Sequence, residues 1–181
     1  ILTIHFNCED VSSNNDNNSE ELLFIASEGN FGQGNGSISV FKDNEKIQEI
    51  SGMGDVLQSI LIHDNHLFAI LNGSSEIKRY SISDQGLTLP GITISTESSS
   101  PREMIVLNNK LYFSNWNSKD IKYLDLINYT VNTLVELNGL PEDIIYKDNK
   151  LFFTINMNED YSSSDQVISY DIDDNKIDKT Y

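Results

Sequence analysis

The residues that most suggest ligand chemistry form a glycine-rich segment, SEGNFGQGNG, at positions 27 to 36. Glycine clusters bind phosphate where a tight turn opens a helix, because the helix N-terminus supplies backbone N–H donors. Here the following residues, 37 to 41, alternate between polar and apolar types and predict a strand. No Lys-Ser/Thr pair follows the glycines. The segment is therefore predicted to be a loop between two strands, either a structural turn or part of a binding face.

A second group of residues could contact a small polar ligand. Trp116 is the only tryptophan and could stack on a ring. Arg102 has the planar guanidinium that suits a carboxylate or a phosphate. Asparagine amides both donate and accept hydrogen bonds, although many of them only satisfy turn backbones. The candidate ligand-binding residues are Asn30, Phe31, Asn72, Arg102, Asn115, Trp116 and Asn156. Phe31, Arg102 and Trp116 have the stronger case.

Patterns for catalysis or metal binding are sparse. His63 and His66 flank a turn, with no carboxylate or cysteine at ligand spacing, so a solvated pair is favoured over a metal site. The segment 171 to 175, DIDDN, resembles the start of a calcium loop, but Lys176 stands where that loop needs glycine. Several acidic residues could hold a cation if they converge, namely Glu28, Asp55, Glu103, Glu142 and Asp143. The sequence predicts no catalytic residue, no metal site and no cofactor.

Composition limits the possible partners. The 181 residues include 12 basic and 28 acidic side chains, giving a net charge of -16. Such a surface argues against nucleic acid and against anionic membrane surfaces, which both require Lys and Arg. No apolar run is long enough to span a membrane. We expect a folded, acidic, monomeric protein whose contact with a membrane is limited to a lipid anchor.

The elements that must position these residues repeat along the chain. The segments HDNHLFA, LNNKLYF and KDNKLFF begin at residues 63, 107 and 147. Their shared leucines, Leu67, Leu111 and Leu151, are 44 and 40 residues apart. Each segment combines an apolar strand, a two-residue Asn/Asp turn and an aromatic-rich strand, which is the pattern of a β-hairpin. Repeats of this length indicate stacked structural units.

Further strands complete each unit. A second apolar strand follows each hairpin, for example at 121 to 125, and a fourth strand follows after another turn. Four strands in about 40 to 45 residues are the size of one propeller blade. The third unit is predicted to have strands at 102–107, 110–115, 120–126 and 129–137. We name the strands of a blade a to d from the inside outwards.

The predicted fold is an all-β propeller of four-stranded antiparallel blades. About four blades are present, at 21–50, 51–95, 96–139 and 140–181, with the first beginning at its strand b near Glu21. A blade buries its faces only against neighbouring blades, so open faces and unpaired edges are a liability. We therefore expect a fragment of an incomplete ring that would close with about six to eight blades.

A family resemblance follows from these repeats. The hairpin motif, followed by strands such as IKYLD and VISYD, resembles the YVTN or YncE-like propeller repeat. Residues 22 to 41, with their EGNFG segment, are similar to the first blade of YncE-like surface lipoproteins of Bacteroidetes-type bacteria. Some members of that group capture corrinoids at the outer membrane, and others have no assigned ligand. The resemblance thus implies a ligand-binding propeller in the cell envelope.

The first residues support an envelope location. The apolar run ILTIHFN ends at Cys8, the only cysteine, and an acidic Ser/Asn-rich segment follows. This layout resembles the end of a bacterial lipoprotein signal peptide, in which the cysteine is lipidated, although Asn7 replaces the usual small residue. The alternative is a buried or incidental free thiol. We expect residues 1–8 to be a signal remnant and 9–20 a flexible polar linker.

These expectations favour a non-enzymatic, lipid-anchored protein at the outer membrane surface or in the periplasm. Its b–c and d–a loops would surround the mouth of the channel and bind a small ligand or an envelope protein partner. Corrinoid capture is one form of this function, implied by the resemblance. Two alternatives are an enzyme, such as a lyase or a quinoprotein-like oxidoreductase with its catalytic residues in missing blades, and an interaction scaffold without a small ligand.

Overall fold

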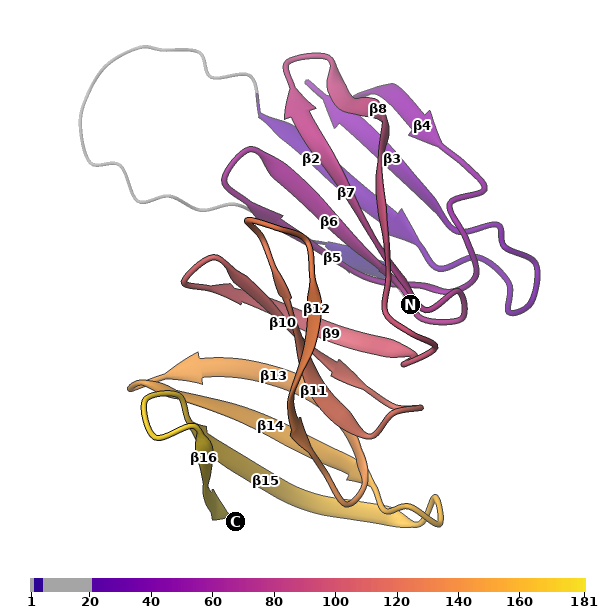
Figure 1. Cartoon of the computed structure of the whole chain (residues 1–181). Coiled ribbons are helices and arrows are strands. Elements are labelled where there is room, and N and C mark those ends of the chain that lie inside the picture. Colours follow the sequence, from indigo (N-terminus) through magenta and orange to yellow (C-terminus); the bar gives the residue numbers. More distant parts are fainter. Residues whose placement is uncertain (1, 5–20) are drawn as a thin grey trace.

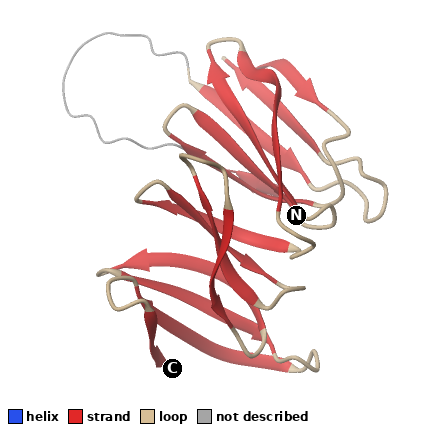
Figure 2. Cartoon of the chain, in the orientation of Figure 1, coloured by secondary structure: helices blue, strands red, loops and turns tan. Residues whose placement is uncertain are grey.

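The computed structural model describes residues 2–4 and 21–181, and every regular element within them is a β-strand (Figure 1, Figure 2). The strands are β1 (Leu2–Ile4), β2 (Leu22–Ser27), β3 (Ser37–Lys42), β4 (Glu45–Ile50), β5 (Leu57–His63), β6 (His66–Leu71), β7 (Glu76–Ser83), β8 (Gly86–Ser95), β9 (Pro101–Leu107), β10 (Lys110–Asn115), β11 (Asp120–Asp125), β12 (Val131–Glu136), β13 (Leu140–Lys147), β14 (Lys150–Met157), β15 (Ser163–Asp171) and β16 (Lys176–Thr180).

These strands form four antiparallel four-stranded sheets, each composed of four consecutive strands. The prediction of an all-β fold built of four-stranded blades is confirmed. The strand positions predicted for the third unit differ from β9, β10, β11 and β12 by at most two residues at either end. Figure 1 shows the four sheets in succession along the molecule, with β5, β9 and β13 as the first strands of the second, third and fourth sheets.

The predicted hairpin turns are present. Asn108 and Asn109 connect β9 to β10, and both have positive φ, at 49° and 59°. Asp148 and Asn149 do the same between β13 and β14, with φ of 51° and 62°. Asn and Asp tolerate this left-handed conformation better than other non-glycine residues. The segment at 171 to 175 is also a turn, because the Asp171 carboxylate accepts hydrogen bonds from the backbone of Asp173 and Asp174.

Alternate residues of a strand pack against opposite neighbours. On β6, Leu67, Ala69 and Leu71 face the first sheet, whereas Phe68 and Ile70 face the third. The same alternation on β10 places Phe113 against the second sheet and Tyr112 against the fourth. Side chains alternate across a strand, so a strand that is apolar at every position is stable only with both faces covered. Three apolar cores, one between each pair of adjacent sheets, therefore hold the described part of the chain together.

The first sheet differs from the prediction that it begins at its strand b. β1 pairs antiparallel with β2, with Leu2 opposite Ser27 and Ile4 opposite Ile25, and so provides strand a. The physical reason is that β2 would otherwise present an unpaired row of backbone N–H and C=O groups. Residues 5–20, which include the proposed lipidation site at Cys8 and the predicted linker, lie outside the described residues. No helix that could cross a membrane occurs in the part of the chain that the structure describes.

Candidate functional site

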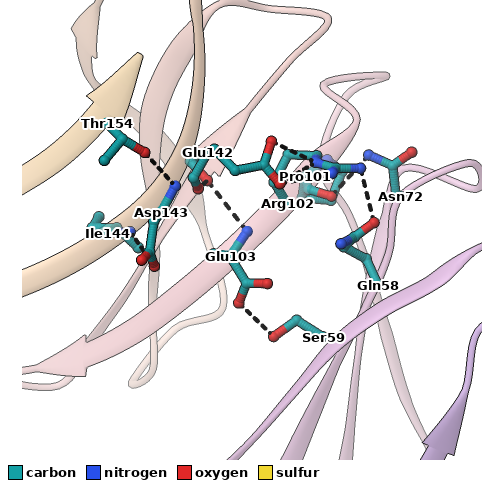
Figure 3. A network of polar contacts seen from close by, with 11 residues as sticks. Gln58, Ser59, Asn72, Pro101, Arg102, Glu103, Glu142, Asp143, Ile144 and Thr154 are labelled. Carbon is teal, nitrogen blue, oxygen red and sulfur yellow. Dashed lines mark hydrogen bonds and ion pairs between the residues drawn. The ribbon is translucent and has the colours of Figure 1, made fainter. Parts of the chain in front are cut away.

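Three inner strands each carry two consecutive polar residues within their first four positions. These pairs are Gln58-Ser59 on β5, Arg102-Glu103 on β9 and Glu142-Asp143 on β13. In each sheet the register between strands a and b shifts beside the polar pair. A bulge interrupts the strict alternation of side chains and re-aims them, and bulges are frequent near functional sites. The polar pairs therefore form a continuous group across three sheets, shown in Figure 3.

Arg102 lies at the centre of this group. Its Nε lies 3.1 and 3.2 Å from the two carboxylate oxygens of Glu142, and its Nη2 donates to Oε1 of Glu142 at 2.7 Å. Its Nη1 donates to Oε1 of Gln58 at 2.8 Å. The side chains of Arg102 and Glu142 are only 17% and 25% exposed, so water screens their attraction less than on the open surface. This polar line connects the second, third and fourth sheets.

Trp116 completes the surroundings of Arg102. The guanidinium carbon of Arg102 lies 4.2 Å from the centre of the Trp116 ring, within the range of a cation–π contact. The backbone N–H of Trp116 donates to the carbonyl of Ser100, which fixes the b–c loop against the preceding d–a loop. The indole Nε1 is buried and has no hydrogen-bond partner among the described residues. The structure thus brings two predicted site residues together, but the charge of Arg102 is already paired with a carboxylate.

Glu103 has the most perturbed environment among the carboxylates of this group. Burial raises the pKa of Glu103, the hydrogen bond from Ser59 opposes that rise, and the nearby Asp143 and Glu142 add to it. The Ser59 hydroxyl donates to Oε2 of Glu103 at 2.8 Å, and the Ser114 hydroxyl accepts from the Glu103 backbone N–H. A carboxyl group whose pKa is raised by burial and by neighbouring carboxylates is a candidate functional group.

The Glu103→Gln substitution is expected to stabilise the protein at neutral pH, because it removes a charge that burial disfavours. The folded-state pKa of Glu103 is raised, so Glu103 contributes stability below its unfolded pKa and loses that contribution as the pH rises through the folded pKa. The variant should melt about 2 °C higher at pH 7.5, and the gain should shrink towards pH 4. Thermal unfolding followed by circular dichroism at both pH values measures this. An equal gain in melting temperature at pH 7.5 and at pH 4 would contradict the raised pKa of Glu103.

The glycine-rich segment forms the loop between β2 and β3, as predicted. Several of its backbone donors already have partners within the protein: the N–H of Asn30 bonds to Asn35, that of Gly32 to the Asp55 carboxylate at 2.7 Å, and that of Gly36 to the Gly54 carbonyl. Gly29 has φ of 82°, and a Cβ there would lie 2.5 Å from the Asn35 amide oxygen. Glycine is thus required at position 29 of a compact loop docked on a d–a loop, and the three donors just named are not free to bind a phosphate.

The outer rim of the same face carries exposed aromatic side chains. Phe31, in the b–c loop of the first sheet, is 85% exposed, and Tyr161, in that of the fourth, is 73% exposed. Asn30 and Asn156 are exposed near them. Aromatic side chains are enriched at interfaces and among their energetically dominant residues, so Phe31 and Tyr161 define a candidate contact surface. The sequence had indicated Phe31 as a candidate ligand-binding residue, whereas Tyr161 was not among the candidates.

Two other predicted residues have structural partners. The Asn72 amide donates to the Pro101 carbonyl at 3.0 Å and so connects the second sheet to β9. Asn115 is fully buried; its amide donates to Asp120 at 2.9 Å and its oxygen accepts from Ser99. Both amides are used to hold the loops in place, which is the turn-satisfying role that the sequence had left open.

The acidic residues considered for a cation converge only in part. Glu103, Glu142 and Asp143 belong to the polar group of Figure 3, whereas the Asp55 carboxylate binds the glycine-rich loop. Within residues 2–4 and 21–181, no group of three or more His, Cys, Asp or Glu side chains has the arrangement of a metal site. Sequence reasoning missed Gln58 and Ser59, although both occupy the repeat positions of Arg102 and Glu103.

Comparisons with known proteins address the fold. No family model matches the sequence, and no curated protein matches it significantly. Among solved structures, a candidate 6-phosphogluconolactonase from Bacteroides uniformis is 10% identical, with a TM-score of 0.69 over 88% of this chain and 53% of the other. A chain of the mitotic checkpoint complex is 12% identical, with a TM-score of 0.66 over 88% of this chain and 48% of the other. A computationally designed protein is 13% identical, with a TM-score of 0.62 over 85% and 87%.

The chain has a β-propeller-like fold. At these identities the similarity concerns the fold alone, and folds of this kind carry many unrelated functions. The chain spans about half of the length of two of these structures, 53% and 48%. Function must therefore be argued from the polar group and the rim.

Proposed function

We propose that this chain is a non-enzymatic binding protein of the cell envelope, of the YncE-like kind, lipid-anchored through Cys8. Its b–c and d–a loop face binds a small ligand or an envelope protein partner, and corrinoid capture is one form of that function. The proposal rests mainly on one observation: aromatic residues stand on the b–c loops of three of the four described sheets. They are Phe31, Trp116 and Tyr161.

The chemistry of this face suits a ligand with a ring or a flat apolar portion. Aromatic side chains bury large areas with little loss of conformational freedom, and Tyr and Trp add a polar end. The indole N–H of Trp116 is buried and has no hydrogen-bond partner among the described residues, so a ligand that reached it could supply the missing acceptor. Arg102 has a supporting role, because its bonds to Glu142 and Gln58 hold the guanidinium against the Trp116 ring.

Fluorescence of Trp116 tests the small-ligand form of the proposal. As the only tryptophan, it reports from one place in the molecule. Titration with a panel of ring compounds that includes corrinoids should give saturable quenching for at least one member. Phe31→Ala should weaken that binding by about tenfold, as expected when an aromatic contact worth about 1–2 kcal/mol is lost.

Two controls make this experiment decisive. Free N-acetyltryptophanamide, titrated in parallel, measures the light that coloured compounds absorb. Ile127→Ala removes a side chain that is 77% exposed on the turn between β11 and β12 and should leave the affinity unchanged. Quenching that never saturates for any compound would count against the small-ligand form.

An enzymatic function has one observation in its favour, the raised pKa of Glu103 beside Glu142 and Asp143. Carboxyl pairs with different proton affinities serve as acid and base in many hydrolases and lyases. The Glu142 carboxylate is paired with Arg102, so it is not free to act as the second acid or base beside Glu103. We therefore keep the binding function as the main proposal.

A further inference from the structure

A separate pocket lies on the opposite face of the molecule, between the second and third sheets. Its volume is about 150 Å³, and its lining includes His63, Asp64, His66, Phe68, Arg79 and Tyr129. The two histidines end β5 and begin β6 at their hairpin, and Arg79 lies on β7. Tyr129 belongs to the turn before β12 in the next sheet. The pocket therefore depends on how two blades meet.

Arg79 makes no ion pair with a carboxylate among the described residues, although Asp64 also lines the pocket. Arg79 donates through Nη1 to the Tyr129 hydroxyl, and its guanidinium carbon lies 5.3 Å from the centre of the Tyr129 ring. The Arg79 Nε is buried and has no hydrogen-bond partner in the part of the chain that the structure describes. The missing carboxylate partner of Arg79 is unexpected because the chain has 28 acidic and only 12 basic residues.

The histidines add further donors. Burial and then the positive charge of Arg79 lower the pKa of His66, while the Asp64 carboxylate opposes that shift. The His66 imidazole has an N–H donor and, in its neutral form, one acceptor nitrogen. His63 lies 3.5 Å from the Asp64 carboxylate, measured from Nε2 to Oδ2. Arginine and imidazole donors thus converge on one small space.

We infer that the pocket between the second and third sheets binds a small monocarboxylate. The guanidinium of Arg79 and the His66 ring would bind the carboxylate, and the Phe68 ring would contact a short alkyl chain. Asp64 at the rim disfavours a doubly charged anion such as phosphate, because like charges repel. The volume accommodates a molecule of only a few non-hydrogen atoms. This site is distinct from the loop face and does not rest on the function proposed for it.

Propionate is the test ligand, and the ring resonances of His63 and His66 are the readout in NMR spectra. Titration at pH 7.5, with sodium chloride keeping the ionic strength constant, should shift both sets of resonances along a saturating curve. Arg79→Gln should weaken this binding at least tenfold. Lys78→Gln, the matched control, removes an equal charge from the neighbouring position of β7, whose side chain projects from the other face of the strand. It should bind propionate like the unchanged protein.

Tyr129→Phe provides a second variant if Arg79→Gln does not fold. It keeps the ring under the guanidinium but removes the hydroxyl that holds Nη1, and it should weaken propionate binding several-fold. Shifts that remain linear in propionate, or that are equal in the Arg79→Gln and Lys78→Gln proteins, would overturn the inference. Tighter binding of inorganic phosphate than of propionate would also overturn it, since the site would then select charge and not a monocarboxylate.

Discussion

Replacing Arg102 by alanine is expected to lower the free energy of unfolding by about 2–3 kcal/mol, which corresponds to a melting temperature roughly 5–10 °C lower. The substitution removes the hydrogen bonds to Glu142 and Gln58 and the contact with the Trp116 ring. It also leaves the Glu142 carboxylate beside Glu103 without its counter-charge. The estimate stays below the cost for a fully buried pair because both side chains keep some exposure to water. Urea denaturation followed by circular dichroism measures the change.

The double variant Arg102→Ala/Glu142→Gln separates charge from packing. With Glu142 neutral, the unpaired carboxylate disappears, so the double variant should recover part of the lost stability. The Arg102→Lys variant should keep only part of the stability that Arg102 provides, because an ammonium group cannot make the forked contact with a carboxylate. A loss below 0.5 kcal/mol for Arg102→Ala would mean that the polar line contributes nothing beyond a surface ion pair.

Replacing Phe113 by alanine is expected to cost more, about 3–5 kcal/mol. Phe113 is fully buried on β10, in the core between the second and third sheets. Truncation removes a large apolar side chain and leaves a cavity that strands held on both sides cannot close easily. Small domains are stable by only about 5–15 kcal/mol in total, so this loss brings the variant close to unfolding at moderate temperature. Urea denaturation again measures the change.

Phe31→Ala is the matched control for Phe113→Ala. It is the same chemical change at a site that is 85% exposed, and its stability should differ from that of the unchanged protein by less than about 0.5 kcal/mol. Similar losses in both variants would contradict the assignment of Phe113 to an apolar core. A loss only in Phe113→Ala would support that assignment and would show that Phe31 is not needed for folding.

The fold could be predicted because its determinants are local and repeated. The Asn/Asp turns fix where each hairpin reverses, and strands such as β6 and β10, apolar at nearly every position, indicate sheets covered on both faces. The shared position of Leu67, Leu111 and Leu151 gave the length of the repeat. The prediction that the first sheet begins at its strand b lacked β1, which the structure forms from Leu2–Ile4 and pairs with β2.

The candidate site could be predicted only in outline. The sequence indicated that Arg102 and Trp116 lie on one face, and the structure brings them into contact. It gave no sign that Arg102 pairs with Glu142, because that contact joins residues 40 positions apart through bulges that have no sequence signature. The pairing of Arg79 with Tyr129 across two sheets was missed for the same reason.

The polar line from Gln58 through Arg102 to Glu142 has a consequence for cooperativity. In repeat proteins each unit contacts only its neighbours, so stability is a sum of unit and interface contributions, and separate units can open independently. Here one arginine joins three successive units at a single point. Partial opening at either adjoining interface would break the same cluster of bonds. Arg102 thus couples two interfaces that the repeat architecture alone would leave energetically independent.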